Sequence, residues 1–189
     1  MKSFDLKGTA RTEVGKKSTS ELRKNNGIPC VLYGIEKEAQ AFAVTTDAVR
    51  KLVYTPDIHL VNLTIDGKEC TAILKDIQFH PVKDTILHMD FHQVVADKPI
   101  VMEVPTVLNG LAAGVKLGGK LQQAIRKIKV KALYANIPEK LTVDVTELGL
   151  GKSIKVGDLS FENLELVTPA QTVVCSVAAT RASREAAGK

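Results

Sequence analysis

Apolar and polar residues alternate along much of this chain, which is the pattern of half-buried β-strands. The clearest case spans residues 60–79, where two runs rich in β-forming residues flank Asp66-Gly67. Asp-Gly between two such runs is typical of a type I′ turn, because both turn positions require positive φ. We therefore predict a β-hairpin at this point.

Two short helices and further strands are predicted in the same half of the chain. Ser18 and Glu21 have the spacing of a capping box, so a helix is expected to start there and to end at Asn26-Gly27. A second helix is expected over 48–54. The further strands are predicted at 4–12, 30–33, 41–45 and 85–93. In the last strand, one face is predicted to carry Ile86, His88, Asp90 and His92, and the other Leu87, Met89 and Phe91.

Short strands separated by glycines dominate the second half. They are predicted at 100–108, 126–134, 141–146 and 172–179. Roughly 90 residues on either side of a linker are enough for two small cores, so we predict a mainly β protein of two domains. The expected division is a first domain at 1–94, a linker at 95–99, a second β-rich domain at 100–180 and a flexible tail at 181–189.

The composition of the 189 residues is typical of a folded chain, with 44% hydrophobic and 25% charged residues. No apolar run approaches the ~20 residues of a membrane span, and the first residues lack the apolar segment of a signal peptide. These features argue against membrane-spanning, fibrous and exported proteins. Cys30, Cys70 and Cys175 are odd in number and form no CxxC pair, so we expect free thiols in a reducing cytosol.

The net charge of +5 favours a polyanionic partner, and its distribution locates a candidate surface. Residues 1–27 contain seven basic and three acidic side chains. Lys16 and Lys17 precede the first predicted helix, whose N-terminal N–H groups attract anions such as phosphate. With the hydroxyl of Thr19, and with Arg23 one turn later, they form a candidate surface for a nucleic-acid backbone. The alternative is an ordinary basic surface helix.

A second set of cations lies in the other half. Lys127, Lys129 and Lys131 line one face of a predicted strand. They could form another nucleic-acid surface, or they could be edge-strand lysines that block aggregation. The second interpretation is favoured, because no aromatic residue lies among them.

Patterns that could indicate an enzyme or a cofactor site are incomplete. His88-x-Asp90-x-His92 places three potential ligands on one strand face, but zinc usually takes four ligands and no cysteine lies nearby. The segment 114–120 matches GxxxxGK, but Leu121 stands where a P-loop needs Ser or Thr for Mg²⁺. No GxSxG motif is present. We expect no catalytic residue, no metal and no cofactor.

Several ordered motifs resemble one known family over nearly the whole chain. In the first half they are Arg11-x-x-x-Gly15-Lys16-x-x-Thr19-x-x-Leu22-Arg23, Ile28-Pro29-Cys30-Val31-Leu32-Tyr33-Gly34, Lys75-Asp76-Ile77-Gln78-Phe79-His80-Pro81 and His88-Met89-Asp90-Phe91. In the second half they are Gly114-Val115-x-x-Gly118-Gly119, Ile137-Pro138-Glu139 and Val143-Asp144-Val145-Thr146-x-Leu148. The chain resembles the bacterial ribosomal protein family twenty-five of the large subunit, which binds 5S ribosomal RNA, in its two-domain general stress protein CTC type.

This resemblance implies a six-stranded N-terminal β-barrel with short helices, a second β-rich domain and no enzymatic activity. It also implies a cytoplasmic, ribosome-bound protein that contacts an irregular internal loop region of 5S ribosomal RNA through a widened minor groove. The RNA-binding residues expected from the charge pattern and the matched motifs are Arg11, Lys16, Lys17, Thr19, Arg23, Tyr33, Lys75, Gln78, His88 and Asp90.

One departure from the family pattern concerns the first helix. Members often carry two consecutive basic residues just before the Leu-Arg pair, where this chain has Ser20 and Glu21. We expect Glu21 to serve the capping box instead, and Lys75, where a relative has a neutral amide, to compensate in part. Binding is therefore expected to rely less on electrostatics than in a fully basic relative.

The sequence thus predicts a non-enzymatic component of the large ribosomal subunit. Its first domain is expected to bind 5S ribosomal RNA, and its second to contact neighbouring ribosomal components. One alternative is a nucleotide-binding module or small enzyme that uses residues 114–120. Another is a protein-interaction module with a basic surface. Neither a membrane nor a small-molecule substrate is expected as a partner.

Overall fold

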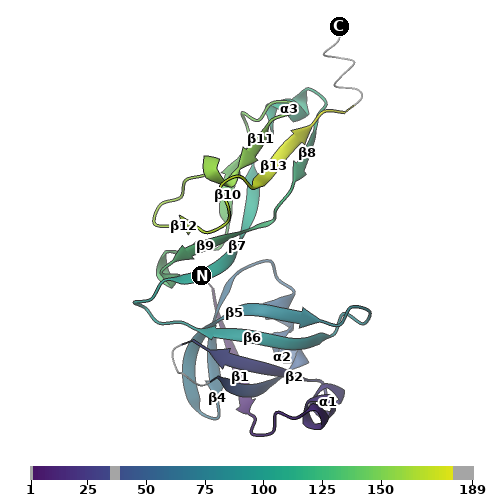
Figure 1. Ribbon diagram of the computed structural model, residues 1–189, viewed down its shortest axis with the longest axis vertical. Helices are drawn as coiled ribbons and strands as arrows, with labels where there is room; N and C mark the ends of the chain where they lie inside the picture. The colour runs from purple at the N-terminus through teal and green to yellow at the C-terminus, as the bar shows by residue number, and fades with distance from the viewer. Residues whose placement is uncertain (1, 35–38, 181–189) are drawn as a thin grey trace. The chain divides into compact units, whose positions relative to one another are not determined.

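Strands from the first half of the chain close into a six-stranded β-barrel in the order β1-β3-β2-β6-β5-β4 (Figure 1). The computed structural model describes residues 2–34 and 39–180, so the predicted tail lies outside the described residues. The barrel strands are β1 (Lys2–Ala10), β2 (Gly27–Tyr33), β3 (Gln40–Thr45), β4 (His59–Ile65), β5 (Lys68–Phe79) and β6 (Ile86–Gln93). Two helices, α1 (Lys16–Lys24) and α2 (Thr46–Val53), complete this unit. The predicted barrel with short helices is confirmed.

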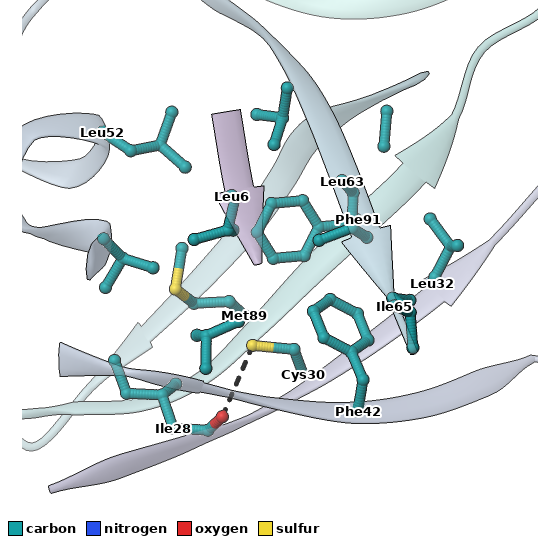
Figure 2. Close-up of a cluster of buried hydrophobic side chains, with 14 of the residues drawn as sticks. Leu6, Ile28, Cys30, Leu32, Phe42, Leu52, Leu63, Ile65, Met89 and Phe91 are labelled. Atoms are coloured by element: carbon teal, nitrogen blue, oxygen red, sulfur yellow. Dashed lines mark hydrogen bonds between the residues drawn. The ribbon is translucent and has the colours of Figure 1, made fainter. Parts of the chain in front are cut away.

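Aliphatic side chains and two phenylalanines fill the barrel (Figure 2). The rings of Phe42 and Phe91 are tilted against each other with centroids 5.6 Å apart. Cys30 is a free thiol in this core and donates a weak hydrogen bond to the carbonyl of Ile28. Burial, together with the charge of Asp90, raises the pKa of Cys30 to about 12. The thiol therefore stays protonated at neutral pH and acts as a small apolar group.

The hairpin between β4 and β5 confirms the predicted turn. Asp66 and Gly67 have φ angles of 47° and 84°, as a type I′ turn requires. The end of α1 is also as predicted, because Asn26 adopts φ 58° directly after the helix.

The start of α1 differs from the prediction. The helix begins at Lys16, with Gly15 as its N-cap, so Ser18 lies inside the first turn and no capping box forms. The Ser18 hydroxyl donates instead to the carbonyl of Glu13. Glu21, one turn too far along the helix to act as a cap, is exposed.

The predicted faces of β6 are correct from His88 to His92 but wrong at its first two residues, because Leu87 is also absent from the core. The register between β5 and β6 shifts between Gln78 and Phe79, and this irregularity pairs Phe79 with Ile86. Ile86 is therefore buried with Met89 in the core, whereas the prediction placed it on the face of His88. Alternation fails here because a bulge inserts one extra residue into the strand.

The second unit begins at Pro99 and contains two small sheets. The first has the order β10-β7-β9-β12, and the second β11-β13-β8. Their strands are β7 (Ile100–Asn109), β8 (Lys120–Gln123), β9 (Lys127–Ala132), β10 (Leu141–Asp144), β11 (Ser153–Lys155), β12 (Glu165–Leu166) and β13 (Val173–Ala178). One short helix, α3 (Ala113–Lys116), and two 3-10 turns, Tyr134–Asn136 and Val156–Asp158, lie between them. No described helix is long and apolar enough to span a membrane.

The lysines of β9 do not lie on an edge strand. β9 pairs with β7 on one side and with β12 on the other, so the edge-strand interpretation is wrong. Lys131 forms an ion pair with Glu165 at 2.9 Å, and Lys129 lies 3.8 Å from Glu103. These glutamates come from the neighbouring strands β7 and β12. They neutralise part of the positive charge of the β9 lysines, which the sequence of β9 alone shows as purely basic.

The glycine-rich segment 114–120 does not form a phosphate-binding loop. The N–H groups of Gly114, Gly118 and Gly119 donate to carbonyls of the protein itself, those of Leu148, Val115 and Gly114. A P-loop needs such N–H groups free for phosphates, and it continues into a long helix, whereas α3 has four residues. The structure thus gives no support to the nucleotide-binding alternative.

Gly114 has a packing role that alanine cannot fill. A Cβ at this position would lie 2.7 Å from the backbone carbon of Gly149 and 2.7 Å from the backbone nitrogen of Leu150. We expect Gly114→Ala to destabilise the second unit by about 1–3 kcal/mol, because backbone must shift to admit the methyl group. Urea unfolding measures the loss, and hydrogen exchange assigns it to β8 and β13.

Gly149→Ala is the matched control. A Cβ there would meet only the flexible Lys152 side chain, at 3.7 Å or more. This control is expected to unfold like the parent protein. Equal stability of the two variants would show that the backbone of Gly149 and Leu150 can admit a methyl group at position 114 without cost.

Candidate nucleic-acid interface

Three adjacent barrel strands, β2, β6 and β5, form the platform of the candidate site. Tyr33 is in register with His92 across the β2–β6 pair, and Gln78 is in register with His88 across the β5–β6 pair. Residues in register share one face of a sheet, so these four side chains lie on the outer surface of the barrel. Phe91, between them in sequence, faces the core.

Helix α1 is attached to this platform by one arginine. The Nε and Nη2 atoms of Arg23 donate to the carbonyl of Leu87 at 3.1 and 2.9 Å. Leu87 immediately precedes His88, so this bidentate contact brings the basic segment of the chain beside the polar face of β6. Two residues 64 positions apart thereby join the two halves of the candidate site.

The loop that leads into α1 is ordered by two of the predicted RNA-binding residues. Arg11 Nη2 donates to the carbonyl of Glu13 at 3.0 Å and to the hydroxyl of Thr19 at 3.2 Å. The same hydroxyl donates to the carbonyl of Gly15 at 3.0 Å. Arg11 and Thr19 therefore shape the start of the helix, and Arg11 keeps further N–H donors for a partner.

Lys16 and Lys17 occupy the first turn of α1. Both are exposed, and neither has a side-chain partner within the described ranges. This turn contains no acidic residue, and the first N–H groups of a helix lack intrahelical acceptors. The two ammonium groups and the helix terminus thus present positive charge at one place, which suits a phosphate.

His88 and Asp90 form a hydrogen-bonded pair on β6. The distance from His88 Nδ1 to Asp90 Oδ1 is 2.7 Å, and both side chains are partly exposed. Because a carboxylate only accepts, the proton of this bond resides on Nδ1. Among the residues that the structure describes, Nε2 makes no hydrogen bond, so it can serve a base edge.

His92 is a member of this face that the sequence-based assignment omitted. Its ring packs edge-on against Tyr33, with centroids 5.6 Å apart. Burial and the charge of Lys75 lower the pKa of His92, so its imidazole is neutral at pH 7. Burial and the nearby carboxylates of Asp90 and Asp76 raise the pKa of Tyr33. The sequence contains a signal for His92, because the alternation His88-x-Asp90-x-His92 puts it on the same strand face as the two predicted residues.

Lys75 occupies the second irregularity of β5. The register shifts between Leu74 and Asp76, which leaves Lys75 outside the regular pairing and sets Asp76 opposite Asp90. Its charge still acts on His92, so the ammonium group lies near the same face. The structure therefore groups the ten predicted residues on α1, the loop before it and the face of β2, β6 and β5.

This arrangement lacks the features of a metal centre. No group of three or more His, Cys, Asp or Glu side chains in the described part of the chain is placed to hold an ion. His88 and Asp90 bond to each other instead. What the face offers is ammonium and guanidinium groups, one imidazole–carboxylate pair and an aromatic pair, a set that suits phosphates and base edges.

Two family models match the chain. The Ribosomal L25p family matches residues 6–91, and the C-terminal domain of ribosomal protein TL5 matches residues 99–181. Similar curated proteins are named large ribosomal subunit protein bL25. That of Phocaeicola vulgatus is 62% identical over 99% of this chain and 98% of its own length, and that of Bacteroides thetaiotaomicron 62% identical over 99% and 97%. That of Porphyromonas gingivalis is 57% identical over 100% and 99%.

Proposed function

Because this chain belongs to the ribosomal L25p family and carries a TL5-type C-terminal domain, we propose that its barrel binds 5S ribosomal RNA in the large ribosomal subunit. The family consists of structural, non-enzymatic ribosomal proteins. The observation that carries the proposal is the Arg23–Leu87 contact, which unites the cationic helix α1 with the His88–Asp90 pair. We further propose residues 1–94 as the RNA-binding domain, 95–99 as the linker and 100–180 as the domain that contacts neighbouring ribosomal components in the cytoplasm.

The proposed binding mode divides the work between two kinds of contact. Lys16, Lys17 and the free donors of Arg11 hold phosphates and fix the position of the RNA without reading its sequence. His88, Asp90 and Gln78 reach base edges or ribose hydroxyls, which the wide, shallow minor groove of RNA exposes. Imidazole can accept from a base amino group, and a carboxylate can do the same. Ser20 and Glu21 on the exposed surface of α1 supply no cation to this interface.

Competition with transfer RNA tests the proposal. The full chain is titrated with 5S ribosomal RNA in a gel-shift assay, with excess transfer RNA as competitor. We expect a complex that survives the competitor, because base-edge contacts add to phosphate attraction. A complex that transfer RNA abolishes would indicate only a basic surface and would contradict the proposal.

Lys16→Ala isolates the phosphate contacts. It is expected to weaken binding to 5S ribosomal RNA and to unrelated RNA alike, and to reduce the slope of log K against log salt by about one unit at most. The matched control is Lys51→Ala, which removes an equal charge from the exposed surface of α2. Affinity measured at several salt concentrations gives the slope. An unchanged slope for Lys16→Ala, or an equal change of slope for both variants, would show that Lys16 does not contact a phosphate of the RNA.

A further inference from the structure

Tyr33 lies at an end of the candidate RNA face where its own strand gives it little support. It is the last residue of β2, and the register of β2 with β3 stops one residue earlier, where Leu32 lies opposite Gln40. The next residue, Gly34, leaves the strand with φ 140°. On the other side, Tyr33 is in register with His92 of β6. Within the described residues, His92 is therefore the strand partner that remains for Tyr33.

The ring of His92 packs edge-on against the ring of Tyr33. The centroids are 5.6 Å apart and the ring planes are inclined by 89°. Edge-to-face contact is one of the arrangements that aromatic rings prefer. The imidazole also approaches Gly34 closely, because a Cβ added there would lie 3.3 Å from Cε1 of His92. The last residue of β2 and the glycine that follows it thus both border this ring.

The nitrogens of His92 do not explain its contact with Tyr33. A lowered pKa leaves the imidazole neutral at pH 7, so it meets Tyr33 as an aromatic ring and not as a cation. Its Nδ1 is buried and makes no hydrogen bond of normal geometry in the part of the chain that the structure describes. A buried nitrogen without a partner costs free energy. What the imidazole offers Tyr33 is therefore the packing of its ring.

We propose that His92 is a positioning residue, whose ring holds the ring of Tyr33 in the orientation that meets the RNA. This inference rests on the proposed function, since it concerns how the same face binds. Aromatic side chains stack on the unstacked bases of RNA. A ring that is already held loses less freedom when it binds. His92 therefore raises the affinity through Tyr33, without a contact of its own with the RNA.

A second histidine of the barrel provides a matched control. His59 of β4 also packs edge-on against an aromatic ring, that of Phe4 on β1, with centroids 6.0 Å apart. Its Nδ1 is likewise buried without a hydrogen bond of normal geometry among the described residues. The strands β1 and β4 lie outside the β2-β6-β5 face. His59→Ala thus removes the same kind of contact from the barrel without altering the candidate site.

Affinities of the full chain for 5S ribosomal RNA, measured by gel shift with excess transfer RNA, test the proposal. We expect His92→Ala to weaken binding about threefold to tenfold, the range that corresponds to one aromatic pair. His92→Phe, which keeps a ring, is expected to restore most of this affinity, and His59→Ala to bind like the parent protein. In a Tyr33→Ala chain, the further change His92→Ala is expected to have little effect, because no ring is left to hold.

Several results would overturn the proposal. One is parent-like binding of His92→Ala, and another is an equal loss for His59→Ala, which would show a general effect on the barrel. A His92→Phe variant as weak as His92→Ala would show that the RNA needs the imidazole itself, and an undiminished loss in the Tyr33→Ala chain would show that His92 acts independently of Tyr33.

Urea unfolding of each variant checks that the barrel is intact. If His92→Ala does not fold, His92→Leu takes its place, because leucine fills the space without a ring. If the parent protein itself showed no preference for 5S ribosomal RNA over transfer RNA, the proposed function would fail. That result is distinct from a parent protein that binds specifically and a His92→Ala variant that binds equally well, which would overturn only the role of His92.

Discussion

Replacing His88 with alanine is expected to lower the affinity for 5S ribosomal RNA roughly tenfold to a hundredfold, the range typical of losing a base-edge contact. Binding to transfer RNA is expected to change little, because phosphate contacts remain. His88 is partly exposed on the outer face of β6, and its Nδ1 bond to Asp90 at 2.7 Å fixes the ring and the tautomer. A fixed ring loses little freedom when Nε2 meets a base.

The comparison of two RNAs separates base reading from a general loss of binding. Asp90→Asn keeps the size of the partner side chain but removes its charge, so we expect it to lose part of the discrimination. Circular dichroism of each variant checks that the barrel is intact. If His88→Ala lowered the affinity for 5S ribosomal RNA and for transfer RNA equally, His88 would help to position the RNA but would not read its bases.

Arg23→Ala is expected to have the second large effect, a loss of roughly tenfold or more in affinity for 5S ribosomal RNA. The guanidinium is charged, and hydrogen bonds to charged groups contribute about 1.5–3 kcal/mol each. Its two bonds to the Leu87 carbonyl, at 3.1 and 2.9 Å, hold α1 against β6. Without them, Lys16 and Lys17 would keep their charge, but the helix that carries them would no longer be fixed to β6.

Arg23→Lys separates two roles of Arg23, which are to hold α1 against β6 and to supply positive charge to the interface. Lysine preserves the positive charge but cannot reproduce the planar, two-point contact of arginine. We therefore expect Arg23→Lys to bind 5S ribosomal RNA much more weakly than the parent protein, and to show faster hydrogen exchange in α1. Parent-like affinity for Arg23→Lys would mean that Arg23 contributes only its charge.

Local sequence signals were sufficient to predict the elements that local chemistry determines. The hairpin at Asp66-Gly67 was predictable because few residue pairs adopt positive φ at both turn positions. The end of α1 at Asn26 follows from the same preference. The start of α1 was not predictable, because the hydroxyls of Ser18 and Thr19 bond to the carbonyls of Glu13 and Gly15 in the loop instead of capping the helix.

Long-range pairing explains the other differences. The bulge beside Phe79 moves Ile86 into the core, and no period-two pattern can reveal an inserted residue. The partners of the β9 lysines come from strands that the sequence does not place beside them. Motifs and charge predicted ten residues of the candidate site but omitted His92, and the contact between Arg23 and Leu87, which joins α1 to β6, required the folded chain.

Mapping the RNA-contacting surface directly tests the central claim that the β2-β6-β5 face and α1 bind 5S ribosomal RNA. The full chain, labelled with ¹⁵N, is titrated with this RNA, and amide chemical shifts are followed residue by residue. The account predicts the largest changes at Lys16, Arg23, Tyr33 and along β6 from His88 to His92, with small changes in the second unit. Changes centred on β1 and β4, on α2, or on the second unit would contradict it.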